Sequence, residues 1–333
     1  MTISTTPDSA TERTPTPGKP IEIEGVLDIY LIRPLGALIV AWLKHTRMTP
    51  NAVSWWSVAA AAGAAAAFYD PSWAGAALGA ALLLLSSGLD SADGQLARAT
   101  GGTTELGETL DGFCDSLSFG AIYVSAAMTL IFRLDVSPWL AVLLGLVAGF
   151  SHSIQSALVD YERQLFVYFT RGTGRIEREN PARLRDEFLK ARRAGEGRLP
   201  VLLRWLRTRY CMNQQALLSS STALLRAYDA IRGDAERRAR FLTHYRTAMR
   251  WPLHAWTLMA PNCHKVAIVV CAFLPTVAPD WAPSRYGLAL VLVFNIALDV
   301  VLLLLIAMQR RVDRRLMHVL LAEQQNGATV ARP

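Results

Sequence analysis

Six stretches of the chain are long and apolar enough to predict transmembrane helices. A helix needs about 20 mostly apolar residues to cross the hydrocarbon core of a bilayer. The six stretches are Ala52–Tyr69, Ala74–Leu89, Leu117–Phe132, Trp139–Leu158, Leu253–Val277 and Gly287–Met308. The second and third reach this length only with their polar neighbours, through Arg98 and from Gly107. The pattern predicts an all-α integral membrane protein with six transmembrane helices.

Polar and mixed segments flank these stretches. A Thr- and Pro-rich start predicts a disordered tail, and the charged but partly apolar segment after it, interrupted by Pro34 and Gly36, is typical of an amphipathic interfacial helix. A long arginine-rich segment between the fourth and fifth stretches predicts a helical insert. The expected boundaries are 1–25 for a cytoplasmic tail, 26–50 for the interfacial helix, 51–162 for transmembrane helices one to four, 163–250 for the insert, 251–310 for helices five and six, and 311–333 for a cytoplasmic C-terminal tail.

Composition agrees with a membrane protein and argues against a soluble enzyme. Hydrophobic residues make up 52% of the chain and charged residues 18%, against about 25% charged in soluble domains. Mean hydropathy is +0.25. The four cysteines have no paired spacing, so neither a disulfide framework nor a zinc site is expected.

The distribution of basic residues predicts the orientation. The insert contains 20 Lys and Arg residues against 8 Asp and Glu. The three short loops that join the predicted helices on the other side of the membrane contain only two basic residues, Arg133 and Arg285. The positive-inside rule places both termini and the insert in the cytoplasm, and we expect the cytoplasmic (inner) membrane. The insert is interpreted either as a basic subdomain on an anionic leaflet or as a collector of anionic substrate. A nucleic-acid partner would not explain six spans, and none is expected.

Four carboxylates lie at the cytoplasmic ends of the second and third helices. Asp90 and Asp93 are three residues apart, and Asp111 and Asp115 are four apart, so each pair shares a helix face. A turn near Gly101 lets the two pairs face each other. Ionisable residues inside membrane helices are costly and are therefore functional candidates. Four such carboxylates would repel one another unless they were protonated or held cations.

The donor set predicts the type of metal. All-oxygen ligation without His or Cys favours Mg²⁺ or Mn²⁺, and two such ions can hold a diphosphate. The intervening Gly94 and Ala97 are small enough to let a ligand approach closely. Arg98 offers a fork of donors for phosphate oxygens, and Gly107 keeps the face of Asp111 open.

The complete spacing is Asp90-x2-Asp93-Gly94-x2-Ala97-Arg98-x8-Gly107-x3-Asp111-x3-Asp115. It resembles the signature of the CDP-alcohol phosphotransferase family at all eight fixed positions, and the resemblance covers about 51–162 and 251–310. It implies that the four acids bind the metal ions, that Asp115 is also the catalytic base, and that Gly94, Ala97, Arg98 and Gly107 form the CDP site.

The resemblance also implies the reaction and the partners. An acceptor hydroxyl would attack the β-phosphate of a CDP-linked donor and release CMP. We expect CDP-diacylglycerol as donor, which makes the protein a phospholipid-synthesis enzyme, and a homodimer as its assembly. A small CDP-alcohol with a lipid acceptor, such as a diacylglycerol or ceramide, is the alternative. Family members that accept inositol phosphate are expected to carry Lys and Arg near the end of helix four. Here Gln155–Tyr161 has neither, although Arg163 follows, which weakens the assignment to inositol phosphate.

Further polar residues are candidates for substrate binding. His152 lies on a polar face of helix four that lines the acceptor pocket or bonds neighbouring helices. His264 and Lys265 interrupt helix five; they bind the acceptor, or Lys265 balances the charge of the acids. Asn51 contacts substrate or caps the first span. Cys114, between two acids, is read as a core residue.

Two non-catalytic functions fit the acids less well than group transfer. An ion carrier or channel predicts acids spread through the membrane depth, whereas these four cluster at one end. An inactive scaffold is expected to have lost at least one acid, and all four are present.

Overall fold

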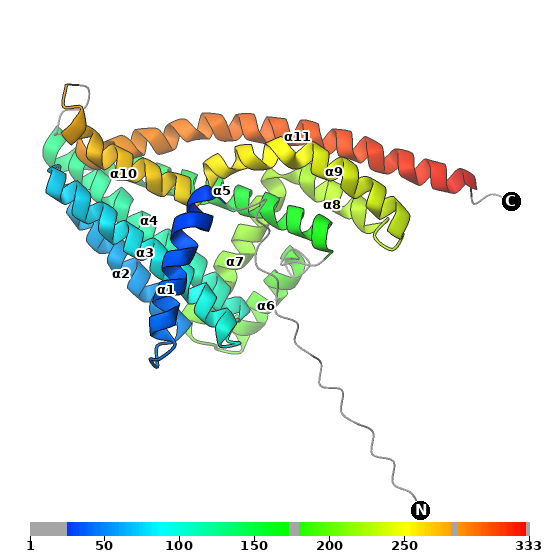
Figure 1. Ribbon diagram of the computed structural model, residues 1–333, viewed down its shortest axis with the longest axis horizontal. Helices are drawn as coiled ribbons and strands as arrows, with labels where there is room; N and C mark the ends of the chain where they lie inside the picture. Colours follow the sequence, from blue (N-terminus) through cyan, green and yellow to red (C-terminus); the bar gives the residue numbers. More distant parts are fainter. Residues whose placement is uncertain (1–24, 173–179, 281–285, 331–333) are drawn as a thin grey trace, which may run out of the picture.

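The computed structural model describes residues 25–172, 180–280 and 286–330, and these contain helices but no strands. The predicted 1–25 tail, except Gly25, and Arg285 lie outside the described residues. Figure 1 shows the arrangement. In chain order the elements are η2 (Asp28–Ile32), α1 (Arg33–Leu43), α2 (Pro50–Tyr69), α3 (Trp73–Ala99), α4 (Glu105–Leu134), α5 (Pro138–Arg171), α6 (Pro181–Arg193), α7 (Arg198–Leu217), α8 (Ser219–Asp229), α9 (Ala235–Trp256), η4 (Thr257–Met259), α10 (Pro261–Val277), η5 (Gly287–Ala289) and α11 (Leu290–Val330).

The predicted all-α membrane fold is confirmed. Among the described residues, α2, α3, α4, α5 and the stretch Gly287–Ala322 are long and apolar enough to cross a bilayer, and the bent pair of α9 and α10 brings the number to six if it forms one span. Large apolar side chains on these helices point outward, as expected for a surface that meets lipid. Examples are Phe132, Leu146, Phe150, Leu303 and Leu304.

α4, which carries two of the acids, and α2, which packs beside it, begin at capped turns. Thr49 accepts a hydrogen bond from the Ala52 amide before α2, and Thr104 accepts one from the Gly107 amide, at 3.0 Å, before α4. A side-chain acceptor at this position satisfies an otherwise unpaired amide of the first turn. α2 packs against both α3 and α4, so the ends of these three helices meet on one side of the molecule (Figure 1).

The fifth predicted transmembrane stretch is not one continuous helix. α9 ends at Trp256, a short 3-10 turn follows, and α10 begins at Pro261 with a bend of 46°. A proline disfavours helical geometry in the residue before it, and Ala260 is extended accordingly, with φ −72° and ψ 146°. The prediction of an unbroken span over Leu253–Val277 was therefore wrong, and the break places the polar start of α10 inside the molecule.

Of the segment predicted as an interfacial helix, residues 26–43 are helical and pack on α3, whereas residues 44–49 are not helical. A Cβ added to Gly88 would lie 2.7 Å from Leu35, and one added to Gly36 would lie 2.8 Å from the Ser91 hydroxyl. Both glycines thus allow close contact between the two helices. Trp42 is exposed on the other face of α1. An apolar outer face beside charged residues suits a position at the membrane surface.

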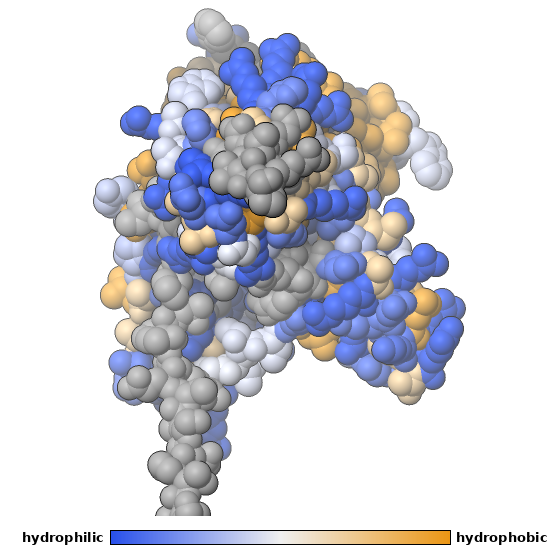
Figure 2. Space-filling model, turned by 90° about the vertical axis from the view of Figure 1, so that its right-hand side faces the viewer, coloured by the Kyte–Doolittle hydropathy of each residue, from blue (hydrophilic) through white to orange (hydrophobic). Residues whose placement is uncertain are grey.

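The insert consists of α6–α9 and packs on two parts of the membrane domain. α7 contacts α4, whereas α8 and α9 pack against α11. The second contact is built around buried aromatic residues, including Phe169, Tyr228, Phe241 and Tyr245. α5 and α11 continue beyond the predicted boundaries at 162 and 310 to join this core. The end of the molecule formed by the insert and the far part of α11 presents mostly hydrophilic residues (Figure 2).

Candidate active site

The two acidic pairs lie where α3 ends and α4 begins. Asp90 and Asp93 belong to the last turns of α3, and Asp111 and Asp115 to the first turns of α4. Between the helices, Gly101 has a φ of +67°, which glycine adopts without the strain that a side chain would cause. This turn reverses the chain and brings the two pairs to the same end of the helices.

The four carboxylates converge around the base of α4. Each lies within electrostatic reach of the Cys114 thiol, which is buried and fits the core role predicted for it. Asp93 and Asp111 are hydrogen-bonding neighbours across the gap between their helices. Two carboxyl groups in such contact need a proton or a cation between them. The structure thus brings together the four acids that the spacing singled out.

The most deeply buried of the acids is held by α2. Asp93 is 4% exposed, and it accepts a hydrogen bond from the Ser54 hydroxyl. Ser54 lies one turn into α2, where its hydroxyl is also 3.2 Å from the Pro50 carbonyl oxygen. A buried carboxylate without a partner is costly, so Ser54 provides a fixed donor for it.

Asp115 meets a lysine from the broken helix. The Lys265 Nζ lies 3.7 Å from Asp115 Oδ1, and the Lys265 side chain is only 10% exposed. The same ammonium lies 5.7 Å from the centre of the Phe119 ring, one turn along α4 from Asp115. Asp90 and Asp111 are also within its electrostatic reach. This contact matches the charge-balancing alternative for Lys265, and it depends on the α10 start set by Pro261.

The acids fit a divalent metal in their chemistry. They supply only oxygen donors, the set that Mg²⁺ and Mn²⁺ prefer. In the described part of the chain, however, no three Asp, Glu, His or Cys side chains converge closely enough to hold one ion. Asp93 is turned toward Ser54 and Asp115 toward Lys265. Ligation by all four acids would require these two side chains to turn.

The residues predicted for the CDP site lie on the exposed side of the acids. A Cβ added to Gly94 would lie 3.4 Å from Nη1 of Arg98, whose side chain is exposed. A Cβ on Gly107 would lie 3.0 Å from the Thr104 hydroxyl and 3.8 Å from Asn51 Oδ1.

Thr49, not Asn51, caps α2. The capping alternative for Asn51 is therefore wrong, and its amide lies beside Gly107. Ala97 is partly buried, on the same turns of α3 as Gly94 and Arg98.

Two buried histidines pack one turn deeper. The His152 ring lies 3.8 Å from the Phe119 ring and 4.4 Å from the His264 ring, centre to centre. His264 Nε2 is 2.7 Å from Gln155 Oε1, and its Nδ1 is 3.1 Å from the Ala260 carbonyl. His152 Nδ1 is buried with no hydrogen-bond partner among the described residues. The structure therefore groups both histidines with Lys265 on the membrane side of Asp115.

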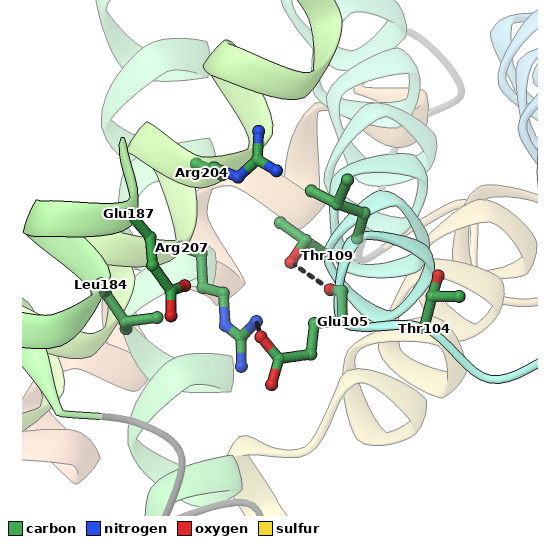
Figure 3. A pocket seen from close by; sticks show the side chains of 8 residues that line it. Thr104, Glu105, Thr109, Leu184, Glu187, Arg204 and Arg207 are labelled. Carbon is green, nitrogen blue, oxygen red and sulfur yellow. Dashed lines mark hydrogen bonds and ion pairs between the residues drawn. The ribbon is translucent and has the colours of Figure 1, made fainter. Parts of the chain in front are cut away.

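The insert supports α4 beside the face that carries the acids. Arg207 on α7 donates to Glu105 in the first turn of α4 at 2.8 Å, and Leu203 packs with Leu110 and Cys114. A pocket of about 300 Å³ lies between α4 and the insert. Figure 3 shows the side chains that line it, with Arg207 reaching Glu105. Glu105 and Gly107 are two residues apart and so point in nearly opposite directions on a helix.

Sequence reasoning missed several residues of this site. Ser54 is one of two serines in an alanine-rich helix, and Phe119 looks like any core aromatic. Arg207 is one of 20 basic residues of the insert. The one sequence signal for Ser54 is that it interrupts an apolar pattern. No local signal distinguishes Phe119 or Arg207 from similar residues nearby.

The sequence model of the CDP-alcohol phosphatidyltransferase family matches residues 47–168. A search of curated proteins and a search of solved structures found no match. The matched region contains α2, α3, α4 and most of α5, with the whole acidic pattern and the caps that position it. The insert and α11 lie outside it. The matched region includes Asp90 to Asp115, so residues 47–168 are similar to the domain that defines the CDP-alcohol phosphatidyltransferase family.

Proposed function

We propose that the protein is a metal-dependent CDP-alcohol phosphotransferase of phospholipid synthesis that uses CDP-diacylglycerol as donor. The observation that carries this proposal is the convergence of all four acids of the family pattern at one end of α3 and α4. An acidic site at the end of the apolar helices suits a donor whose nucleotide is soluble and whose lipid is not. An ion pathway would instead need acids along the membrane depth.

Asp115 is the base of the proposed reaction. It accepts the proton of the acceptor hydroxyl, the hydroxyl oxygen forms a bond to the β-phosphorus, and the bond from that phosphorus to the CMP oxygen breaks. The products are a phosphodiester and CMP, with the proton on Asp115. General-base assistance of this kind contributes roughly 10²–10⁴-fold to the rate. Asp115 is partly exposed, and it lies between the residues proposed for the nucleotide and the buried Lys265. A base between the donor and the acceptor sites could reach the acceptor hydroxyl, which supports this role.

Asp90, Asp93, Asp111 and Asp115 would hold Mg²⁺ or Mn²⁺, as two ions. When bound, the ions supply positive charge for the diphosphate and the leaving CMP. The protein's own contribution is to keep the acids together: Ser54 fixes Asp93.

The two sides of the acids suit different substrate parts. On the exposed side, Arg98 would bind the diphosphate, and Gly94, Ala97 and Gly107 leave room for the nucleotide beside Asn51. On the membrane side, Lys265, His152 and His264 would orient the acceptor, with the unpartnered His152 Nδ1 available to a hydroxyl. We further propose that this site faces the cytoplasm in the inner membrane and that the protein is a homodimer.

CMP release by the purified protein tests this function. We expect release with CDP-diacylglycerol to require one acceptor among glycerol 3-phosphate, serine, inositol and inositol 1-phosphate. It should stop with EDTA, return with Mg²⁺ or Mn²⁺, and fall by at least about 10²-fold in Asp115→Asn. Asp135→Asn, in the loop after α4, is the matched control and should keep wild-type turnover.

Two results would contradict parts of the proposal. Wild-type turnover in Asp115→Asn would remove its role as base. Release only from CDP-choline or CDP-ethanolamine, with diacylglycerol or ceramide as acceptor, would replace CDP-diacylglycerol by a small CDP-alcohol donor.

A further inference from the structure

A second pair of acids is buried away from the active site, where the insert meets the membrane helices. Glu162 is on α5 and Asp313 on α11, each about one turn beyond the apolar stretch of its helix. Glu162 is 0% exposed and Asp313 is 2% exposed. α8 and α9 of the insert cover them, within the largest hydrophobic cluster of the described residues. The two carboxylates are therefore sealed from water.

One serine bridges the two carboxylates. The Ser221 hydroxyl lies 2.8 Å from Glu162 Oε1 and 2.8 Å from Asp313 Oδ2. A hydroxyl has one hydrogen, so Ser221 can donate to only one of them at a time. Asp313 has further donors in Ser220, at 2.7 Å, and Gln309, at 2.8 Å. Glu162 Oε2 has no hydrogen-bond partner among the described residues.

A separate observation points to a missing ligand. The hydroxyl of Tyr245, on α9, is buried and also lacks a hydrogen-bond partner in the described part of the chain. It lies within electrostatic reach of both Glu162 and Asp313. Its ring is fixed by Phe169, 4.7 Å away between centres, so the hydroxyl cannot turn to solvent. Buried polar groups almost always have hydrogen-bond partners. Here two buried oxygens, Glu162 Oε2 on α5 and the Tyr245 hydroxyl on α9, lack one among the described residues.

The charge of the pair is also unbalanced. Neither carboxylate interacts with a Lys, Arg or His of the described residues. A proton on Glu162 Oε1 could be donated to Ser221 Oγ while Ser221 donates to Asp313. That arrangement would still leave Glu162 Oε2 and the Tyr245 hydroxyl without partners among the described residues. A proton on Glu162 Oε2 would itself need an acceptor. A cation would neutralise both acids and accept lone pairs from every unpartnered oxygen.

We propose that Glu162 and Asp313, with Tyr245 and the bridging Ser221, form a divalent-cation site that is separate from the catalytic acids. Two carboxylates and two hydroxyls are hard oxygen donors, the set chosen by Mg²⁺, Mn²⁺ or Ca²⁺. The donors come from α5, α8, α9 and α11. A bound ion at this Glu162–Asp313 site would join the insert to the two membrane helices that frame it, so its role is structural.

The test counts bound metal and measures its effect on stability, without using activity. The full-length protein carries Asp90→Asn and Asp111→Asn, which weaken the proposed catalytic metal site. After EDTA treatment, Mn²⁺ or Ca²⁺ alone is added. We expect about one bound ion per chain and a rise in melting temperature of about 3 °C or more.

Adding Glu162→Gln, and separately Asp313→Asn, should abolish both the bound ion and the rise. Asp229→Asn is the matched control, because it removes an insert carboxylate that hydrogen-bonds to Tyr168 at 2.6 Å, away from the pair. It should leave both readouts unchanged.

An unchanged ion count and melting rise in both Glu162→Gln and Asp313→Asn would overturn the proposal. So would the absence of any bound ion in the starting protein together with a higher melting temperature of Glu162→Gln at neutral pH, which would identify a protonated acid pair. If a variant unfolds, Tyr245→Phe, which removes one donor and keeps the ring, should weaken Mn²⁺ binding by about 10-fold or more. An unchanged affinity in that variant counts against the site.

Discussion

At the scale of single residues, two of the three glycines of α4, Gly107 and Gly112, have different surroundings. A side chain on Gly107 would enter the space between Thr104 and Asn51, whereas one on Gly112 would meet nothing within 4 Å. Both belong to the same helix, so helix propensity acts on them alike. Only Gly107 is therefore needed for its small size.

Replacing Gly107 by Ala should raise KM for the CDP-linked donor by about 10-fold, because the methyl group takes space proposed for the nucleotide. Gly112→Ala should leave KM unchanged and stabilise α4 by about 0.5–1 kcal/mol, the usual gain for this change in a helix. Steady-state CMP release and thermal unfolding measure the two effects. Equal donor KM in the two variants would show that Gly107 does not border the nucleotide.

At the scale of elements, α7 acts as a support for α4. Arg207 and Glu105 join the two helices at 2.8 Å, with side chains 11% and 33% exposed. Leu203 packs behind the turns that carry Asp111 and Asp115. Because the acids must keep their positions to within a fraction of an ångström for catalysis, a shift of α4 reaches the site directly.

Loss of the Arg207–Glu105 ion pair should lower kcat by about 10-fold with a smaller change in acceptor KM. Arg207→Gln and Glu105→Gln should have similar effects, and the double variant should be no worse than either, with a coupling energy of about 1 kcal/mol. The control is Arg183→Gln, since Arg183 lies 3.9 Å from Glu105 and is 51% exposed. If the two single effects simply add, the pair does not position α4.

At the scale of the whole molecule, the positive charge of the insert predicts which side of the membrane it occupies. Arg192 on α6 and Ser137 before α5 are both exposed and lie on opposite sides in the predicted topology. Cys114 and Cys211 are buried and should react little with a thiol reagent.

In intact cells, a membrane-impermeant maleimide should label Ser137→Cys but not Arg192→Cys, because the positive-inside rule keeps the basic side in the cytoplasm. Inside-out vesicles should give the reverse pattern. The wild-type protein, which retains the partly buried Cys263 and Cys271, sets the background. Labelling of Arg192→Cys in intact cells would invert the proposed topology.

Much of this architecture could be read along the chain. The apolar runs predicted the helices, and the spacing of Asp90, Asp93, Asp111 and Asp115 predicted a shared site, since both depend on the regular rise and turn of one helix. The caps of α2 and α4 are equally local, but neither Thr49 nor Thr104 was predicted as a capping residue. Pro261 was visible too, but its effect was underestimated because a bend inside an apolar run does not alter hydropathy.

The sequence by itself determined that the protein is a bundle of membrane helices and that the four acids of its motif lie at one end of two of them. The tertiary structure decided which side chains meet: Lys265 with Asp115, Ser54 with Asp93, and Ser221 with both Glu162 and Asp313. These partners are separated by tens to hundreds of positions in the chain. Their contacts follow from how whole helices pack, and helix periodicity is the same for every possible packing.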